Sequence, residues 1–173
     1  MNKLFFALAF VSIGFFSSCD KCKDADCKNG ATCEKKVGDC NCAQFYSGTK
    51  CESQVRNSYV GKYIGTSVQS VTVGGNTDNE TSPDTIEVSI SGTDPSMLVV
   101  KGDGTAADPD VPVTLTSNTN YKVNATFNEG SGNVTMNGTG TFSSTTLTLN
   151  ATFSGTVLGN TLTGTLTFTG TKQ

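Results

Sequence analysis

Seven cysteines are the residues of this chain whose type and spacing point to chemistry. Six of them lie between Cys22 and Cys51 in the pattern C-x4-C-x5-C-x6-C-x-C-x8-C, and Cys19 precedes them. Cysteines at such spacing form disulfides, bind zinc or supply a thiolate nucleophile. Zinc is disfavoured because the 173 residues include no histidine and the C-x-C pair is closer than a zinc knuckle allows. Because seven thiols cannot all pair, one cysteine needs a separate role.

The N-terminal residues 1–18 have the composition of an export signal. Lys3 is followed by an apolar run over residues 4–16, and Ser17 and Ser18 close that run. A charged start, a short apolar run and a small-residue exit are typical of a secretory signal peptide. The run is too short for a transmembrane helix, which needs about 20 apolar residues. We therefore expect export to an oxidising compartment, where disulfides persist.

The exit of this signal, Phe16-Ser17-Ser18-Cys19, resembles a bacterial lipobox, although Phe16 stands where leucine is usual. The resemblance implies that the Cys19 thiol receives a diacylglycerol, that the signal is removed and that the new N-terminus is acylated. Residues 19–21 would then be the lipidated N-terminus, held on a membrane by two or more acyl chains. A plain secretory signal with an incidental Cys19 is the alternative.

Residues 22–52 resemble an EGF-like module. Beyond the cysteine spacing, Asn29-Gly30 occupies a turn, and Tyr46, Gly48 and Glu52 complete the C-x-C-x5-G-x2-C ending that is typical of that family. Six cysteines allow 15 pairings from sequence alone. The resemblance implies the pairs Cys22–Cys33, Cys27–Cys40 and Cys42–Cys51. A segment this short buries too little apolar surface to fold without such staples. We expect the outer membrane of a Gram-negative bacterium, because an EGF-like module is of most use outside the cell.

After a linker over residues 53–57, residues 58–173 change in composition. Only three charged side chains occur from Val111 to Gln173, and threonines alternate with apolar residues. Four stretches of sequence with this alternation end near Phe127, Phe142, Phe153 and Phe168. Period-two alternation indicates antiparallel strands with one buried face, and threonine suits the exposed face.

The spacing of these rows predicts about eight strands, the earlier four over residues 59–73, 85–91, 97–101 and 111–116. Between them, residues 74–84 and 102–110 are expected to be long acidic loops. The fold class is therefore mainly β, with an antiparallel up-and-down barrel favoured over a β-sandwich. The stretch from Tyr59 to Thr66 is similar to the first strand of lipocalin-like barrels in bacterial lipoproteins.

The usual catalytic constellations are missing from the sequence. A Ser-His-Asp or Cys-His arrangement needs a histidine, and the pairing above leaves no free thiolate. We interpret the acids in the turn-rich segments of this part of the chain as solvated loop residues, with a calcium site or a glycosidase carboxylate pair as alternatives; they are Asp78, Glu80, Asp84, Asp94, Asp103, Asp108 and Asp110. A net charge of −3 disfavours nucleic acid. We expect no enzyme activity, no metal and no cofactor.

Two functions fit these expectations. The first is display or adhesion by a monomer that contacts another surface protein or a glycan. The second is a lipocalin-like carrier of a small apolar ligand, with Tyr59, Tyr63 and Tyr121 as lining residues; a hydrolase is a third and weaker fit. Small inward residues would leave room for a ligand, namely Ala125, Gly138, Gly140, Ala151 and Gly164, whereas the four phenylalanines above would fill that room. We expect a filled interior, since packed interiors are the norm, and hence the first function.

Overall fold

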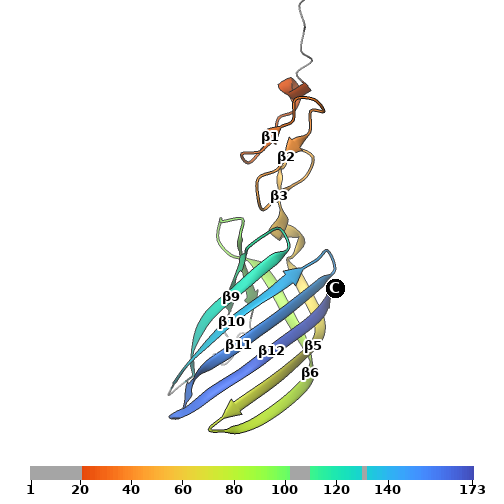
Figure 1. Cartoon of the computed structure of the whole chain (residues 1–173). Coiled ribbons are helices and arrows are strands. Elements are labelled where there is room, and N and C mark those ends of the chain that lie inside the picture. Colours follow the sequence, from red (N-terminus) through yellow and green to blue (C-terminus); the bar gives the residue numbers. More distant parts are fainter. Residues whose placement is uncertain (1–20, 102–109, 130–131) are drawn as a thin grey trace, which may run out of the picture.

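The computed structural model describes residues 21–101, 110–129 and 132–173, and it shows a small cysteine-rich module on one end of a β-barrel (Figure 1). The eight barrel strands form a closed antiparallel ring, so the expected mainly β fold and its barrel are confirmed. The expected signal peptide and Cys19 lie outside the described residues.

Three disulfides hold the cysteine-rich module together. It contains a 3-10 turn, η1 (Lys21–Asp24), and two short pairs of strands, β1 (Thr32–Cys33) with β2 (Cys40–Asn41) and β3 (Tyr46–Ser47) with β4 (Ser53–Gln54). The bridges join Cys22 to Cys33, Cys27 to Cys40 and Cys42 to Cys51, the same pairs that the EGF-like resemblance implied. Among residues 21–54 only Cys51 is buried. The module therefore depends on its bridges rather than on an apolar core.

The barrel is an up-and-down ring in which neighbours in sequence are neighbours in space. Its strands are β5 (Gly61–Val73), β6 (Asn76–Ile90), β7 (Met97–Lys101), β8 (Val111–Leu115), β9 (Asn120–Glu129), β10 (Gly132–Phe142), β11 (Thr146–Val157) and β12 (Asn160–Lys172). The last strand closes the ring on the first, from Leu162 opposite Val73 to Lys172 opposite Tyr63. Closure gives every barrel strand two neighbours, so the ring has no free edge strand of the kind that an open sheet would present.

The expectation of a loop over residues 74–84 is wrong, because β6 begins at Asn76. Gly74 and Gly75 form a two-residue hairpin turn with φ of 56° and 90°, a conformation that glycine adopts without strain. Pairing with β5 then continues from Asn76 opposite Val73 to Val88 opposite Gly61. The first residues of β6 are exposed, so they carry no apolar alternation that would have marked a strand.

Two short strands leave one flank of the barrel incomplete. β7 pairs with β6 only from Glu87 to Ile90, and β8 pairs with β9 only from Tyr121 to Val123. Beyond those ladders, residues 76–86 of β6 and 124–129 of β9 have no strand partner on that side among the described residues. We call these two strand segments the open flank.

A buried arginine fastens the module to the barrel. Residues 53–57, expected to be a linker, form β4 and most of η2 (Val55–Ser58). The Arg56 guanidinium is 4% exposed, and its Nη1 donates to the carbonyl oxygens of Ser91, Asp94 and Met97 at 3.1, 2.5 and 2.9 Å. Its Nε donates to Gln54 Oε1 at 2.8 Å. Carbonyl dipoles of the β6–β7 turn thus solvate the buried charge in place of water.

The module also contacts the turn between β8 and β9. Gln44 Nε2 donates to the Thr116 carbonyl at 3.0 Å, and the Phe45 amide donates to Asn118 Oδ1 at 2.9 Å. Phe45 and Val55 pack against the hydrophobic core of the barrel. The module therefore covers the near end of the barrel.

We predict that Arg56→Met lowers the free energy of unfolding by about 3 kcal/mol, because it leaves several turn carbonyls buried without a donor. Thermal unfolding should show a midpoint about 10 °C lower. The matched control is Lys62→Met, since Lys62 is an exposed cation on β5, and it should shift the midpoint little. Equal effects of the two substitutions would contradict the anchoring role of Arg56.

Candidate functional site

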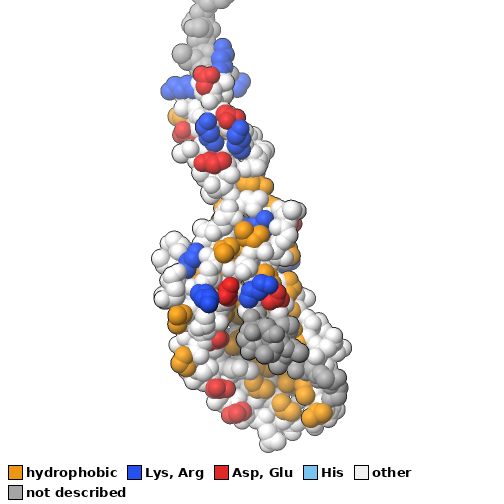
Figure 2. Space-filling model, turned by 180° about the vertical axis from the view of Figure 1, so that it is seen from behind, with side chains coloured by type: hydrophobic (Ala, Val, Ile, Leu, Met, Phe, Trp, Pro, Cys, Tyr) orange, Lys and Arg blue, Asp and Glu red, His pale blue; other side chains and the backbone are white. Residues whose placement is uncertain are grey.

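The half of the barrel far from the module encloses a cavity of about 630 Å³. Most of its lining is apolar and comes from β5 and β9–β12: Val71, Val123, Phe127, Val134, Met136, Leu147, Leu149, Phe153, Val157, Leu162 and Leu166. Figure 2 shows hydrophobic side chains at the surface of this end, with acidic side chains on the same face. The cavity has the size and the apolar character of a small-molecule site.

An aromatic cluster separates the cavity from the module. We call Tyr59, Tyr63, Tyr121 and Phe142 the aromatic plug. The Phe142 ring stacks on Tyr59 with centroids 4.5 Å apart, and its centroid lies 4.7 Å from Tyr121 and 6.3 Å from Tyr63. All four side chains are at most 5% exposed. The plug therefore fills the near half of the barrel and forms the floor of the cavity.

Each phenol of the plug donates its hydrogen bond to a backbone carbonyl. Tyr59 donates to Asn118, Tyr63 to Tyr59 at 3.0 Å, and Tyr121 to Thr148 at 2.7 Å. Of the three tyrosines that we expected to line a ligand site, Tyr121 contacts the cavity, and Tyr59 and Tyr63 lie deeper in the plug. Their hydroxyls are engaged in packing the plug rather than offered to a ligand.

The expectation of a filled interior holds only for the near half. Phe142 and Phe168 are buried there, whereas Phe127 and Phe153 are partly exposed and line the cavity. The inward glycines do not create this space. A Cβ on Gly164 would meet the Phe153 ring, so that ring already occupies the room beside the glycine. The space arises instead where β7 and β8, at five residues each, end, because Val100, Lys101 and Val111 are the residues of these two strands that reach the lining.

The polar groups of the cavity lie near the open flank. Gln69 projects from β5, and Asp84 and Thr85 belong to β6. The Ser67 hydroxyl donates to Asp84 Oδ2 at 2.5 Å, and the Thr85 amide donates to Asp84 Oδ1 at 2.7 Å. The fourth group, Lys101, ends β7, and its Nζ lies 2.5 Å from Asp110 Oδ2.

Reasoning from the sequence missed the role of Asp84, which it assigned to a solvated loop. The alternation Asp84, Ile86, Val88 on one face of β6 was the available signal, but Pro83 and the preceding polar run concealed the strand. The other acids of residues 58–173 that the structure describes do lie at the exposed surface, namely Asp78, Glu80, Asp94 and Asp110. Asp103 and Asp108 lie outside the described residues.

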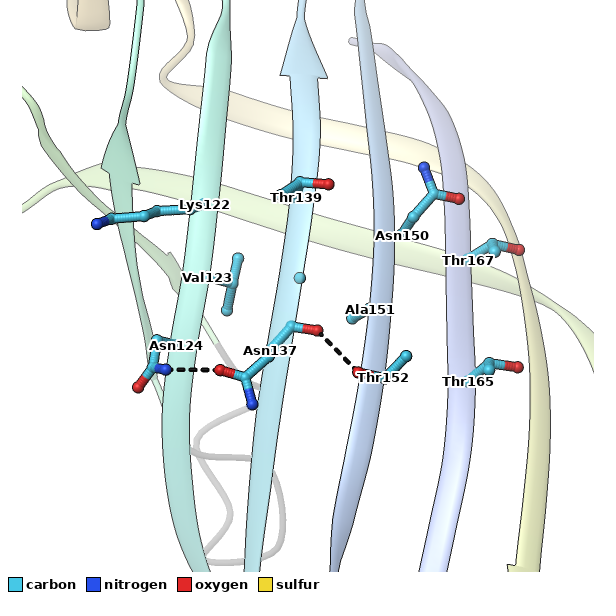
Figure 3. Close-up of a pocket in the computed structure, with 11 residues that line it drawn as sticks. Lys122, Val123, Asn124, Asn137, Thr139, Asn150, Ala151, Thr152, Thr165 and Thr167 are labelled. Atoms are coloured by element: carbon cyan, nitrogen blue, oxygen red, sulfur yellow. Dashed lines mark hydrogen bonds between the residues drawn. The ribbon is translucent and has the colours of Figure 1, made fainter.

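A second hollow, of about 710 Å³ and wide open to solvent, lies on the outer face of β9–β12 (Figure 3). Most of its side chains are amides and hydroxyls arranged across neighbouring strands, with Val123 and Ala151 among them, and Lys122 is the one charged residue in the lining. Asn124 Nδ2 donates to Asn137 Oδ1 at 2.6 Å, and Thr152 donates to the Asn137 carbonyl at 3.4 Å. The surface suits polar contact with a partner and has no apolar pocket for an anchor side chain.

Neither a cluster of metal ligands nor a membrane-spanning helix occurs in the described residues. No group of three or more histidine, cysteine, aspartate or glutamate side chains there is arranged to hold a metal ion. No helix in residues 21–101, 110–129 or 132–173 is long and apolar enough to cross a membrane.

Comparison with known proteins finds few similarities. The chain matches no protein-family model and none of the curated proteins. Among solved structures it is similar to a putative outer membrane protein from Bacteroides fragilis, with 22% identity and a TM-score of 0.38. That match covers 70% of this chain and 54% of the other, so the chain spans about half the length of the protein it matches. A likeness this weak carries no argument about function.

We predict that the plug makes the stability of the barrel fall at alkaline pH. Burial raises the pKa of Tyr63 to about 12 and also raises the pKa values of Tyr59 and Tyr121. In the unfolded chain these phenols ionise near pH 10. Their contribution is therefore complete below about pH 10 and is lost as pH rises towards about 12.

The measurement is the free energy of unfolding as a function of pH, followed together with the ultraviolet absorbance of tyrosinate. Tyr63→Phe removes one of the three buried phenols, so its stability should fall less steeply above about pH 10. A slope in Tyr63→Phe equal to that of the wild type would contradict the assignment.

Proposed function

We propose that the barrel binds a small, mainly apolar ligand in its interior cavity, and that the protein is a carrier or binding protein rather than an enzyme. The observation that supports this most directly is the cavity of about 630 Å³ with its apolar lining. Pockets for small molecules typically measure about 300–1,000 Å³ and combine an apolar lining with a few polar groups. An eight-stranded barrel is wide enough to hold one such ligand.

The filled near half and the hollow far half support this proposal together. The aromatic plug and the Arg56 anchor hold one end of the barrel rigid, with every hydrogen-bonding group of the plug satisfied. A rigid floor allows the cavity to persist without a ligand, which reduces the ordering cost of binding.

Display or adhesion remains the second candidate function, and the polar hollow on the outer face of β9–β12 is the observation that favours it. The two candidates differ in what they require of the interior. A display protein needs no ligand inside its barrel, so it predicts that apolar probes leave the protein unaffected.

We predict that the environment-sensitive dye Nile red binds residues 20–173 prepared with their disulfides but without lipid, and that it becomes more fluorescent on binding. At 100 times its dissociation constant a ligand raises the free energy of unfolding by about 2.7 kcal/mol, which is measurable as a thermal shift. Val71→Trp should abolish both signals, since Val71 lines the cavity and the larger ring occupies the space of the ligand.

The matched control is Val68→Trp, because Val68 lies on the same strand but is 48% exposed on the outer face. It should leave dye binding unchanged. A wild-type protein that neither brightens the dye nor gains thermal stability would overturn the carrier proposal and favour display.

We further propose that the protein is exported and lipid-anchored at Cys19, with residues 22–52 as an EGF-like module next to the membrane. The lipobox-like sequence before Cys19 supports the anchor. The three disulfides support an extracytoplasmic location, since such bridges persist in oxidising compartments. Because all six cysteines of the module are paired, Cys19 is the one cysteine that they leave for another role.

We predict that mass spectrometry of the mature N-terminal peptide finds acyl groups on Cys19, and that the protein partitions into the detergent phase. Cys19→Ser should carry no acyl mass and should lose this partitioning. Ser18→Ala keeps a small residue before Cys19 and should stay lipidated. A wild-type protein without acyl mass would contradict the anchor while leaving the carrier proposal intact.

A further inference from the structure

The polar groups of the cavity are confined to one wall, and this arrangement limits the kind of ligand it accepts. Gln69 lies on β5 and Asp84 on β6, whereas the facing strands β9–β12 contribute apolar side chains and Tyr121, whose hydroxyl already donates to the Thr148 carbonyl. The side-chain amide of Gln69 makes no hydrogen bond to another residue that the structure describes. A cavity of this kind suits a ligand with one polar head on an apolar body.

The charge of this wall is negative. The Asp84 carboxylate accepts hydrogen bonds from Ser67 and Thr85, but no cation among the described residues lies within ion-pair distance of it. Lys101 is the one cation in the lining, and its ammonium group is already paired with Asp110. Glu80 and Asp78 precede Asp84 by four and six residues of β6, so they lie on the same face of the strand.

A negatively charged wall discriminates between head groups. A carboxylate head placed beside Asp84 would meet a like charge and no free cation, and like charges in contact oppose binding. An ammonium head would pair with Asp84, and a hydroxyl head would donate a hydrogen bond to it. The apolar body contributes the same burial in all three cases.

We propose that the cavity selects amphiphiles whose head group is cationic or a neutral hydrogen-bond donor, seated at Asp84 and Gln69, and that it discriminates against carboxylate-headed lipids. This inference depends on the carrier function proposed above and specifies the class of ligand. The ligand head lies at the open flank, and its chain points to the apolar wall.

The test is competition against bound Nile red by dodecylamine, dodecanol and dodecanoate at neutral pH, since these three probes share one alkyl chain and differ in head group. Dodecylamine should displace the dye at a concentration about tenfold lower than dodecanoate, with dodecanol between them. Asp84→Asn should weaken dodecylamine about tenfold, strengthen dodecanoate and change dodecanol little.

The matched control is Glu87→Gln, which removes one negative charge from the same strand. Glu87 is exposed on the outer face, and its carboxylate lies 3.8 Å from the Lys62 ammonium. It should leave the order of the three competitors unchanged, and the same effect from both variants would overturn the placement of the head at Asp84. Dodecanoate binding to the wild type as tightly as dodecylamine would overturn the inference while the carrier function stands, even if Asp84→Asn does not fold. Failure of Nile red to bind the wild type would overturn both.

Discussion

The packing of Phe142 against three tyrosines is the interaction on which the rest of this structure depends. Tyr59 comes from the segment between the module and the barrel, Tyr63 from the first barrel strand and Tyr121 from the fifth, and all three rings lie within 6.3 Å of the Phe142 centroid. The cluster thus joins the segment that enters the barrel to the first, fifth and sixth barrel strands at one point. Stacked and tilted aromatic pairs of this kind stabilise a fold by more than the burial of their apolar surface alone.

This cluster divides the interior into two halves of different character. In the near half, the inward positions are filled by large buried side chains, and the Arg56 guanidinium holds the neighbouring turn through four backbone carbonyls. In the far half, six strands of 10 to 15 residues extend beyond the five-residue strands β7 and β8, so fewer strands contribute inward side chains there. The cavity is therefore a consequence of unequal strand lengths around one ring.

The barrel was largely predictable from the sequence, because threonine on one face and apolar residues on the other leave a period-two pattern in β9–β12. The pattern fails in the first part of β6, where Asn76 to Thr81 are exposed and backbone pairing with β5 alone maintains the strand. The cavity was not predictable for a related reason. The alternation shows which side chains face inward. The space between them depends on how far β7 and β8 extend relative to the other strands, and the sequence of one strand does not show this.

The position of Asp84 shows why the chemistry of the site escaped the sequence. A carboxylate in a run of polar residues has the composition of a solvated loop, and only the register with β5 turns it towards Ser67. That register follows from the two-residue turn at Gly74 and Gly75, since a slip by one residue would move Asp84 to the outer face. The same turn therefore determines how far the β5–β6 hairpin extends in the far half, and it places the negative charge of Asp84 on the inner face. In the proposed lipid-anchored protein, the module lies at the end of the barrel nearest the tether (Figure 1), so the cavity in the other half of the barrel faces away from the membrane.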